Sequence, residues 1–582
     1  MAKKNIQLIV MGLAISFVAI FSGCQNSAPL VSKDIYFPSG KGVKMEAFIP
    51  ADTFAFIKLN PSDGVQIQKL ETLLGYFPKE MLQNLEKSFA DGFDKEGGSL
   101  SFEKDFAPFF RGNPQILLAV KKAPPIENET SESSLPSKTQ GEHDFYEILL
   151  VEVKNQSAVD GFFDQIVRNG EYSIGSYQGQ AYYLEKNVEN PIYFAQYKDV
   201  LVQTNNLKLL ENGLDNVLHQ KNPLQENAVF TRAFQDYRSD YLGFAYFETR
   251  AFLDLISQNM DEKDAQQFQT ILASNNSNIA NVESQSYLLS AEDQGVRIQV
   301  NFHARKDFQG DAFAEMSKSL APLRLAQKVP AQAPVFYTEI FGLQHTLQAA
   351  LTYAKDEQTQ ALLSQDMFKI LDGATSIVIN NDGALLPTFG VYVEANKHEE
   401  QAQSLLAMAD IAVNGALVQL FENSPELKPF VLQSKEGNLR SIKLDVTGLL
   451  AQLASNMPQL STQEVEFYYG LTDDKVLVFT FQPNFIEVWG KNTVSNSASF
   501  QKTQNLLNGY DHNVTYVSPA EIINYVDTLM AFAQQINSAE ATDLADYELV
   551  KPYILPLKSV MLGSARPTPQ RSQMELFIQI GQ

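Results

Sequence analysis

The sequence predicts an α+β fold that is a tandem duplication of two similar modules, each a mainly antiparallel sheet packed with amphipathic helices. Two observations lead to this prediction. Strand candidates follow one another mostly through short polar turns, with helix candidates inserted between them, which is typical of antiparallel sheets. The same ordered series of elements then occurs twice along the 582 residues. An apolar content of 44% with 39 phenylalanines is enough for buried cores, which excludes a disordered chain.

The first residues are predicted to be a lipoprotein signal peptide, residues 1–23, and not part of the fold. A basic start at 3–4 is followed by an apolar run over 9–21 and by small residues at 22–23. The four residues that end at Cys24 resemble the bacterial lipobox, with phenylalanine where that pattern usually has leucine. Because Cys24 is the only cysteine in the chain, we expect cleavage before it and palmitate-type lipidation on it.

This segment has two alternative interpretations. A permanent transmembrane helix would need roughly 20 apolar residues, which is more than the run supplies. An ordinary secretory signal would leave Cys24 incidental. With lipid on Cys24 the protein is expected to be exported and anchored to a membrane of the bacterial cell envelope. Gln25 replaces the aspartate of inner-membrane retention, which favours the outer membrane in a Gram-negative cell.

The remaining chain is acidic and contains no long apolar run. The net charge of the full sequence, −23, disfavours nucleic acid and anionic lipid head groups as partners. No later stretch reaches 18 consecutive apolar residues, so no membrane span is expected beyond the signal. The single cysteine excludes an intramolecular disulfide and a thiolate metal cluster.

Composition shifts divide the mature chain into four parts. Residues 24–47, with two prolines and a turn-like glycine-containing stretch, are expected to form a tether. The first module is predicted over 48–305 and the second over 334–582. The segment 306–333, rich in Ala, Gln, Lys and Pro, is predicted to be the linker between them.

Each module opens in the same way. A proline precedes a strand candidate at Pro50–Leu59 and again at Pro334–Phe341. A helix candidate follows each strand, over 64–89 with a break or kink at Pro78, and over 343–365. This repeated event is the first sign of duplication.

A segment with aspartate and glycine at the same spacing comes next in both modules. Asp105–Gly112 leads into a strand candidate at 115–120, and Asp366–Gly373 leads into one at 376–380. The following strand candidates are 146–153 in the first module and 388–394 in the second.

The connection before these last strands differs between the modules. In the first it is the polar segment 121–144, which is predicted to be a disordered hairpin loop. In the second it is the short turn at 380–383, made of residues that tolerate left-handed backbone.

The later elements also correspond in order, and their helices are expected to be amphipathic and to pack one face on the sheet. The pairs are helices 156–168 and 399–421, hairpins 192–203 and 465–479, strands 241–247 and 514–517, and closing strand pairs 287–302 and 560–580.

Several of these segments resemble a known bacterial family. Ile49–Thr53 matches its Pro-Ala-Asp-Thr opening strand, and 105–112 matches its acidic-aromatic segment that ends in glycine. Asp199–Val202 and the Leu-rich helix 207–217 match a later part. The family is an uncharacterised one of exported or lipid-anchored proteins, a domain of unknown function. The resemblance implies this fold and an envelope location, and it implies no activity.

The motifs of common catalytic sites are missing from the sequence. Neither a Gly-x-Ser-x-Gly elbow nor a phosphate-binding loop occurs. Ser101–Lys104 satisfies a bare Ser-x-x-Lys pattern but lacks its companion motifs, so a chance match is the better interpretation. We therefore predict no catalytic and no cofactor-binding residues, and the question of enzymatic activity stays open with a non-enzymatic role favoured.

Metal ligands and paired carboxylates are also poorly placed. The six histidines are scattered without metal-ligand spacing: His143, His219, His303, His345, His398 and His512. His398–Glu400 is interpreted as a helix start, where acidic residues favour the helix dipole. Asp473 and Asp474 are interpreted as a solvated hairpin turn and not as a catalytic pair. No metal site is predicted.

Aromatic residues gather in one predicted sheet region of each module. They are Tyr172, Tyr177, Tyr182, Tyr183, Tyr193, Phe194 and Tyr197 in the first, and Phe467, Tyr468 and Tyr469 in the second. Core or cross-strand packing is the favoured interpretation. The alternative is a groove for a peptide, glycan or lipid.

Three functional hypotheses follow. The leading one is a lipid-anchored, non-enzymatic envelope protein that binds another protein, a polymer or an apolar ligand. The second is a hydrolase of wall or surface polymer, which needs two converging carboxylates. The third is a carrier or chaperone of an apolar ligand, which needs a cavity of at least a few hundred Å3.

Overall fold

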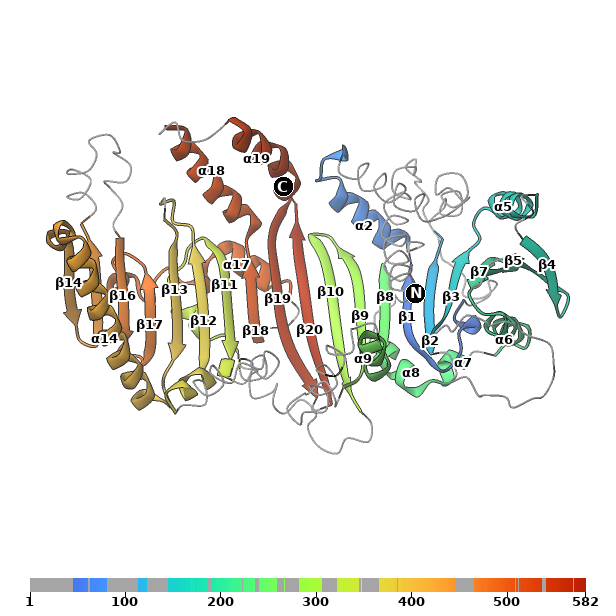
Figure 1. Cartoon of the computed structure of the whole chain (residues 1–582), viewed down its shortest axis with the longest axis horizontal. Coiled ribbons are helices and arrows are strands. Elements are labelled where there is room, and N and C mark those ends of the chain that lie inside the picture. Colours follow the sequence, from blue (N-terminus) through green and yellow to red (C-terminus); the bar gives the residue numbers. More distant parts are fainter. Residues whose placement is uncertain are drawn as a thin grey trace. The chain divides into compact units, whose positions relative to one another are not determined.

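The structure is a computed structural model that describes residues 45–80, 114–122, 145–258, 282–305, 322–344, 366–445 and 465–581, apart from short gaps within these ranges. The chain forms two compact units. The N-terminal unit comprises residues 1–272 and 279–308, and the C-terminal unit comprises residues 273–278 and 309–582. The predicted α+β class with antiparallel sheets is confirmed (Figure 1).

The described strands of the N-terminal unit form an antiparallel array. Their spatial order is β10-β9-β8-β1-β2-β3-β7-β6-β5-β4. Their bounds are β1 (Thr53–Leu59), β2 (Ile116–Lys122), β3 (Phe145–Glu152), β4 (Tyr172–Tyr177), β5 (Gln180–Glu185), β6 (Tyr193–Tyr197), β7 (Val200–Thr204), β8 (Gly243–Glu248), β9 (Val282–Glu292) and β10 (Gly295–Ala304).

Helices connect these strands. They are η1 (Met45–Phe48), α2 (Gly64–Leu74), α5 (Gln156–Arg168), α6 (Leu207–Leu218), α7 (Pro223–Glu226), α8 (Ala228–Gln235) and α9 (Thr249–Gln258). Asp63 caps the start of α2 by accepting hydrogen bonds from two backbone amides at 3.1 Å. The helix predicted over 64–89 is broken earlier than Pro78, because α2 ends at Leu74 and Gly75 follows as its C-cap.

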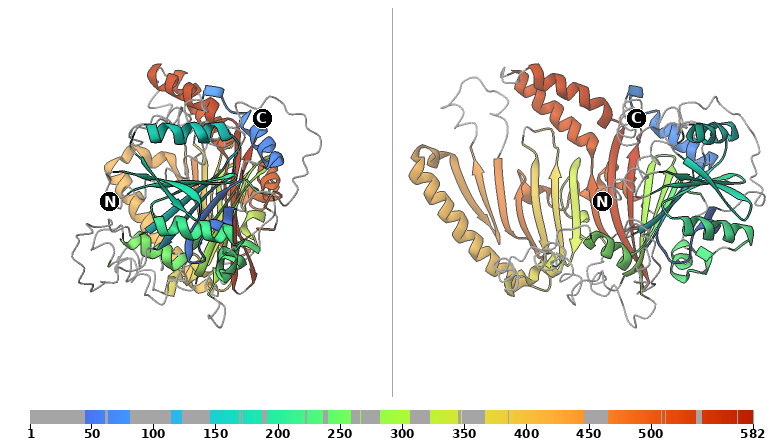
Figure 2. Two further views of the ribbon diagram at one scale, coloured as in Figure 1. Left: turned by 90° about the vertical axis from the view of Figure 1, so that its right-hand side faces the viewer. Right: turned by 45° about the vertical axis from the view of Figure 1, so that its right-hand side comes forward.

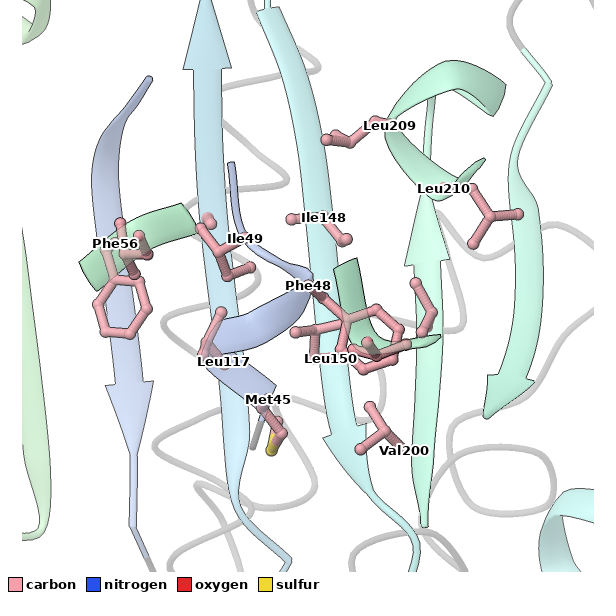
Figure 3. Packing of buried hydrophobic residues seen from close by; sticks show 14 of the residues in the cluster. Met45, Phe48, Ile49, Phe56, Leu117, Ile148, Leu150, Val200, Leu209 and Leu210 are labelled. Carbon is pink, nitrogen blue, oxygen red and sulfur yellow. The ribbon is translucent and has the colours of Figure 1, made fainter. Parts of the chain in front are cut away.

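The main core of the N-terminal unit lies between the sheet and the side that carries η1 and α6. Figure 3 shows Phe48 and Ile49 packed with Leu117, Ile148 and Leu150 from β2 and β3. Met45 is also buried in this cluster. The folded part therefore begins inside the predicted tether 24–47, because the turn at 45–48 supplies core side chains. The other sheet face packs against α5 through Val159, Phe162, Phe163 and Ile166.

The C-terminal unit has the corresponding strand order. It runs β20-β19-β18-β11-β12-β13-β17-β16-β15-β14, again antiparallel at every step. The bounds are β11 (Pro334–Phe341), β12 (Ala374–Asn380), β13 (Thr388–Glu394), β14 (Val431–Glu436), β15 (Leu439–Leu444), β16 (Val465–Leu471), β17 (Val476–Phe481), β18 (His512–Val517), β19 (Leu557–Thr568) and β20 (Arg571–Ile580).

Helices again fill the connections. They are η4 (Leu325–Gln327), η5 (Asp366–Asp372), α14 (Glu399–Asn423), η6 (Pro425–Phe430), α16 (Phe485–Val488), η8 (Val494–Asn496), α17 (Ala498–Gln504), α18 (Pro519–Gln535) and α19 (Ala541–Ile554). Along the chain, α14 connects β13 to β14, as α5 connects β3 to β4 in the N-terminal unit. Figures 1 and 2 show α14 beside strands β14 to β16.

The end of the predicted linker 306–333 belongs to the C-terminal unit. Leu325, Ala326 and Val329 are buried in its main core. Glu339 of β11, itself only 4% exposed, accepts hydrogen bonds from the backbone amides of residues 324, 325 and 326 at 2.6, 3.2 and 3.0 Å. The linker prediction was wrong for these residues, because a carboxylate distant in sequence fastens them to the sheet.

A comparable contact precedes the first strand of the N-terminal unit. Lys58 of β1 pairs with Glu46 of η1 at 2.5 Å. The strand pairing shows which residues correspond in the two units. In the N-terminal unit Phe56 pairs with Ala119, which pairs with Ile148. In the C-terminal unit Tyr337 pairs with Val378, which pairs with Gly390. Lys58 and Glu339 lie two residues beyond the first members of these ladders. Each unit thus holds a short 3-10 turn against its first strand through a charged side chain.

The predicted loop 121–144 begins two residues later than expected. Lys121 and Lys122 are strand residues of β2, and Lys121 pairs with Asp52 at 2.5 Å. Residues 123–144 lie outside the described part of the chain. The helix predicted over 343–365 also falls almost entirely outside it.

Candidate functional site

Several predicted features cannot be placed. Cys24 and the whole signal segment lie outside the described residues, and so do Ser101–Lys104, Asp105–Gly112, His143 and His345. Their predictions therefore stay predictions.

The described histidines do not assemble a metal centre. Among the residues that the structure describes, no group of three or more His, Cys, Asp or Glu side chains could hold a metal ion. His398 precedes α14, as predicted, and Glu399 in the first turn of α14 pairs with Lys475 at 2.6 Å. These residues start a helix.

Asp474 is fixed by neighbours and is not simply solvated. Its carboxylate lies 2.7 Å from Lys328 and accepts hydrogen bonds from Thr472 at 2.6 Å and from Trp489 Nε1 at 3.3 Å. Partial burial opposes ionisation, but the hydrogen bonds from Lys328 and Thr472 outweigh it and lower the pKa of Asp474. The turn therefore has a structural role that ties the β16–β17 hairpin to residue 328, and we find no pairing of its carboxylate with Asp473.

The aromatic residues of β4 to β7 serve mainly as core. Tyr172, Tyr193 and Phe194 are buried, and Tyr183 stacks on Phe163 of α5 with ring centroids 4.2 Å apart. Tyr177 donates a hydrogen bond to Asp215 of α6 at 2.9 Å. Packing and cross-strand contacts thus account for these side chains, as favoured by the sequence.

One hollow among the described residues lies at the end of β3, beside Glu152, Lys154, Asn155 and Leu201. It encloses essentially no space, whereas a bound apolar molecule needs a cavity of a few hundred Å3.

The most unusual surface of the described residues is α14. Met408, Ile411 and Val418 lie on one side of this helix because their spacing is three and seven residues. Their exposed fractions are 50%, 75% and 55%. Leu420 lies on the opposite side and is also exposed. We call Met408, Ile411 and Val418 the α14 surface.

The side of α14 that packs on the sheet runs from Ala402 and Leu406 through Ala409 to Val413. Ala402 and Leu406 are buried with Leu471 and Leu477 on one sheet face, whereas the residues that follow Ile411 are exposed or half-buried. Of the helices that the structure describes, α14 alone is long and apolar enough to cross a membrane by length and composition. One face of α14 packs on the sheet as predicted, but its outer side also carries exposed apolar residues, so α14 is less amphipathic than expected.

The helix at the same place in the N-terminal unit behaves differently. α5 buries Val159, Phe162, Phe163 and Ile166 against the sheet, and apart from Val167 its exposed side is mainly polar. Arg168 and Asp164 form an exposed ion pair at 3.2 Å. α5 is therefore an ordinary amphipathic sheet helix, and α14 departs from that pattern.

The one charged residue between Gln401 and Phe421 is neutralised. It is Asp410, whose two carboxylate oxygens lie 2.5 and 2.7 Å from the guanidinium of Arg440 on β15. A two-point contact of this kind compensates the charge and fixes its direction. The middle of α14 is thus held to β15, while its outer side exposes Ile411 and Val418 with the uncharged Asn414 between them.

Aromatic side chains lie exposed on the same sheet face. Phe389 of β13 pairs with Phe481 of β17, and both are more than one-third exposed. Phe467 of β16 lies 4.9 Å from Phe481 between ring centroids. The ladder places Glu147 of β3 where β13 has Phe389, because Thr204 donates to the carbonyl oxygen of Glu147 as Thr480 does to that of Phe389. The C-terminal unit therefore has an apolar surface where the N-terminal unit carries a carboxylate.

Sequence reasoning missed the α14 surface for an identifiable reason. A search for uninterrupted apolar runs fails on residues 411–421, because Asn414, Gly415 and Gln419 interrupt them. The usable signal was the absence of charged residues from 411 to 421, combined with apolar residues on every side of the helix.

Comparisons with known proteins add little to this picture. No family model and no curated protein matches the chain, which is consistent with an uncharacterised family of unknown function. Among solved structures, crystal forms I and III of the protein TP0453 align with 48% of this chain and with 85% and 88% of their own length. The identities are 7% and 9%, and the TM-score is 0.25 for both. This likeness is too slight to identify a fold or a function.

Proposed function

We propose that this protein is a lipid-anchored protein of the cell envelope with a non-enzymatic binding role, and that it binds through the α14 surface. The observation that carries the proposal is the outward side of α14, where Met408, Ile411 and Val418 are at least half exposed. Contiguous exposed apolar side chains on a folded protein mark sites of interaction.

The anchoring part of the proposal comes from Cys24, whose position after an apolar segment and small residues suits lipidation. A lipid anchor on that residue would confine the chain to a membrane surface. A binding protein needs no catalytic set, which agrees with the missing sequence motifs for common nucleophiles.

We also propose that the two units arose by duplication and have since diverged in function. Their identical strand order supports this, as does the shared hydrogen bond from Thr204 and Thr480 to the neighbouring strand at 2.6 and 2.9 Å. The polar outer side of α5 and the apolar outer side of α14 then represent divergence at one place in the fold. The C-terminal unit would carry the binding function.

Neither a hydrolase nor a carrier is favoured by a specific observation. The carboxylates of Glu399, Asp410 and Asp474 each lie within 2.7 Å of a basic side chain. The hollow beside β3 encloses essentially no space for a ligand.

The test compares the full-length protein with two double variants after purification from its own envelope in mild detergent. Ile411→Asp with Val418→Asp changes the α14 surface. Leu549→Asp with Val550→Asp is the control, because these residues of α19 are similarly exposed, at 67% and 49%. Mass spectrometry then quantifies the lipids and proteins that co-purify.

We expect at least one lipid or protein to co-purify with the wild-type protein and with the α19 control. The amount of that component should be at least tenfold lower with the α14 variant. Unchanged emission of Trp489, the only tryptophan, shows that the C-terminal unit is folded in each preparation. The same components at the same level in all three proteins would refute binding through α14.

A further inference from the structure

We propose that the second half of α14, residues 411–421, inserts shallowly into the hydrocarbon of a lipid bilayer. This inference rests on the proposed function and names what the α14 surface binds.

The chemistry of the segment favours hydrocarbon over a protein partner. No residue from Ile411 to Phe421 is charged. The α14 surface consists of aliphatic and thioether side chains, Met408, Ile411 and Val418, and the exposed Asn414 and Gln419 beside them are uncharged. Protein interfaces instead depend on aromatic and arginine side chains surrounded by hydrogen-bonding groups. An aliphatic surface with few polar groups suits acyl chains.

The local charges are compatible with contact at a bilayer. Asp410 would oppose insertion if it were uncompensated, because a bare carboxylate is costly in hydrocarbon. Its ion pair with Arg440, at 2.5 and 2.7 Å, removes that obstacle and keeps the charge on the sheet side of the helix. Glu422 follows the segment and marks where it returns to water.

The packing of α14 decides between spanning and shallow insertion. A helix of 25 residues is long enough to cross a bilayer. The first half cannot leave the protein without exposing the core, because Ala402 and Leu406 are 0% and 1% exposed in the cluster with Leu471 and Leu477. The more exposed part, 411–421, in which Val413 still packs against that cluster, is only about 16 Å long at the usual helical rise. It can lie in the interface but cannot cross.

The proposed anchor would make a modest affinity sufficient. The segment between Cys24 and Met45 reaches at most about 70 Å when fully extended, so a lipidated chain stays close to the bilayer surface. At such a high local concentration, a weakly inserting helix remains bound for much of the time.

The first experiment uses the chain from Gln25 to Gln582, which contains every described residue and no cysteine. Ile411→Cys then gives a unique site for a polarity-sensitive NBD label, and Leu549→Cys gives the control. The probe is a vesicle of pure phosphatidylcholine. We expect a blue shift and at least a twofold gain in emission at position 411, quenched by lipids brominated near the top of the acyl chain. The label at position 549 should not respond.

The second experiment measures flotation of the unlabelled chain with the same vesicles. We expect Ile411→Asp with Val418→Asp to reduce the bound fraction at least fivefold, and Leu549→Asp with Val550→Asp to change it less than twofold. Adding phosphatidylglycerol should leave binding equal or weaker, because the net charge of −23 becomes −25 when Lys3 and Lys4 are absent.

The outcomes separate this inference from the proposed function. No response at position 411, or equal responses at 411 and 549, overturns the insertion of α14. If that happens while the α14 variant still loses a co-purifying protein, binding through α14 stands and its partner is a protein. If the α14 substitutions change neither vesicle binding nor the set of co-purifying components, both proposals fall.

Discussion

Glu339 shows how a single buried residue organises the start of the C-terminal unit. Its carboxylate accepts three backbone amides of residues 324–326 and the hydroxyl of Tyr337, the last at 2.5 Å. Burial and the neighbouring Glu339 raise the pKa of Tyr337 well above its usual range, so the phenol remains a donor at any ordinary pH. The charge of Glu339 is thus balanced by donors and not by a basic side chain.

Replacing Glu339 by alanine should lower the free energy of unfolding of the C-terminal unit by about 3–5 kcal/mol, because four donors lose their acceptor in a buried place. Urea unfolding followed by Trp489 emission measures this, since Trp489 stacks on the buried Tyr392. The control is Glu399→Ala, which breaks the exposed pair with Lys475 and should cost less than about 1 kcal/mol. Equal effects of the two substitutions would contradict the role given to Glu339.

Glu147 provides a pH-dependent prediction for the N-terminal unit. Burial raises the pKa of its carboxyl from 4.5 to about 7. The folded protein therefore holds a proton between pH 4.5 and 7 that the unfolded chain has released, so this residue makes stability fall as the pH rises through that range. Glu147→Gln should be more stable than wild type at pH 8, by roughly 1–3 kcal/mol, and equally stable near pH 4.

Differential scanning calorimetry across pH 4–8 measures the Glu147 effect. Glu399→Gln serves as the control, because its partly exposed ion pair should show no gain at high pH. A Glu147→Gln difference that is independent of pH would mean that hydrogen bonding or packing, and not ionisation, governs the residue.

Elements with strong local signals were predictable from sequence. Residues 156–168 form α5 with the predicted bounds, because its apolar residues follow the helical period and its polar ones face water. The start of η4 was not predictable, because it depends on Glu339, 13 to 15 residues along the chain. The exposure of α14 was hidden for a related reason: the extent of the sheet beneath the helix decides which half is covered.

Gly373 gives the aspartate-to-glycine segment a structural meaning. A Cβ atom on this residue would lie 2.5 Å from the backbone oxygen of Glu394 on β13. The glycine thus allows η5 and β13 to approach each other closely. The segment predicted from sequence as a repeated feature is explained here by packing.

Gly373→Ala should therefore destabilise the C-terminal unit by about 2 kcal/mol or more, because backbone must move to admit the methyl group. Gly415→Ala is the matched control within α14, where a Cβ meets nothing within 4 Å. It should stabilise the unit by up to about 1 kcal/mol through helix propensity. Urea midpoints from Trp489 emission compare the two, and destabilisation by both would refute the steric explanation.

At the scale of the whole molecule, two units with one strand order carry different outer surfaces. The N-terminal unit has Glu147 and a polar α5 where the C-terminal unit has Phe389 and an apolar α14. We interpret the first as scaffold and the second as the binding unit, and we propose that both are attached to a membrane through Cys24.

Cys24→Ser should abolish lipid labelling of the protein in cells and leave both units folded, because the main cores of the two units are built from Met45 onward. Metabolic incorporation of labelled palmitate, followed by immunoprecipitation, measures this. Wild-type protein without label, or label that persists in Cys24→Ser, would refute the anchor.

The central claim is that α14 is the surface through which the anchored protein makes contact in its native membrane. The most direct measurement places a photo-crosslinking amino acid at position 411 of the full-length protein in the cells that make it, and at position 549 as a control. The proposed function predicts adducts at 411, of lipid mass if the hydrocarbon inference is also right, and none at 549. Absence of adducts at 411, or equal adducts at both positions, would contradict it.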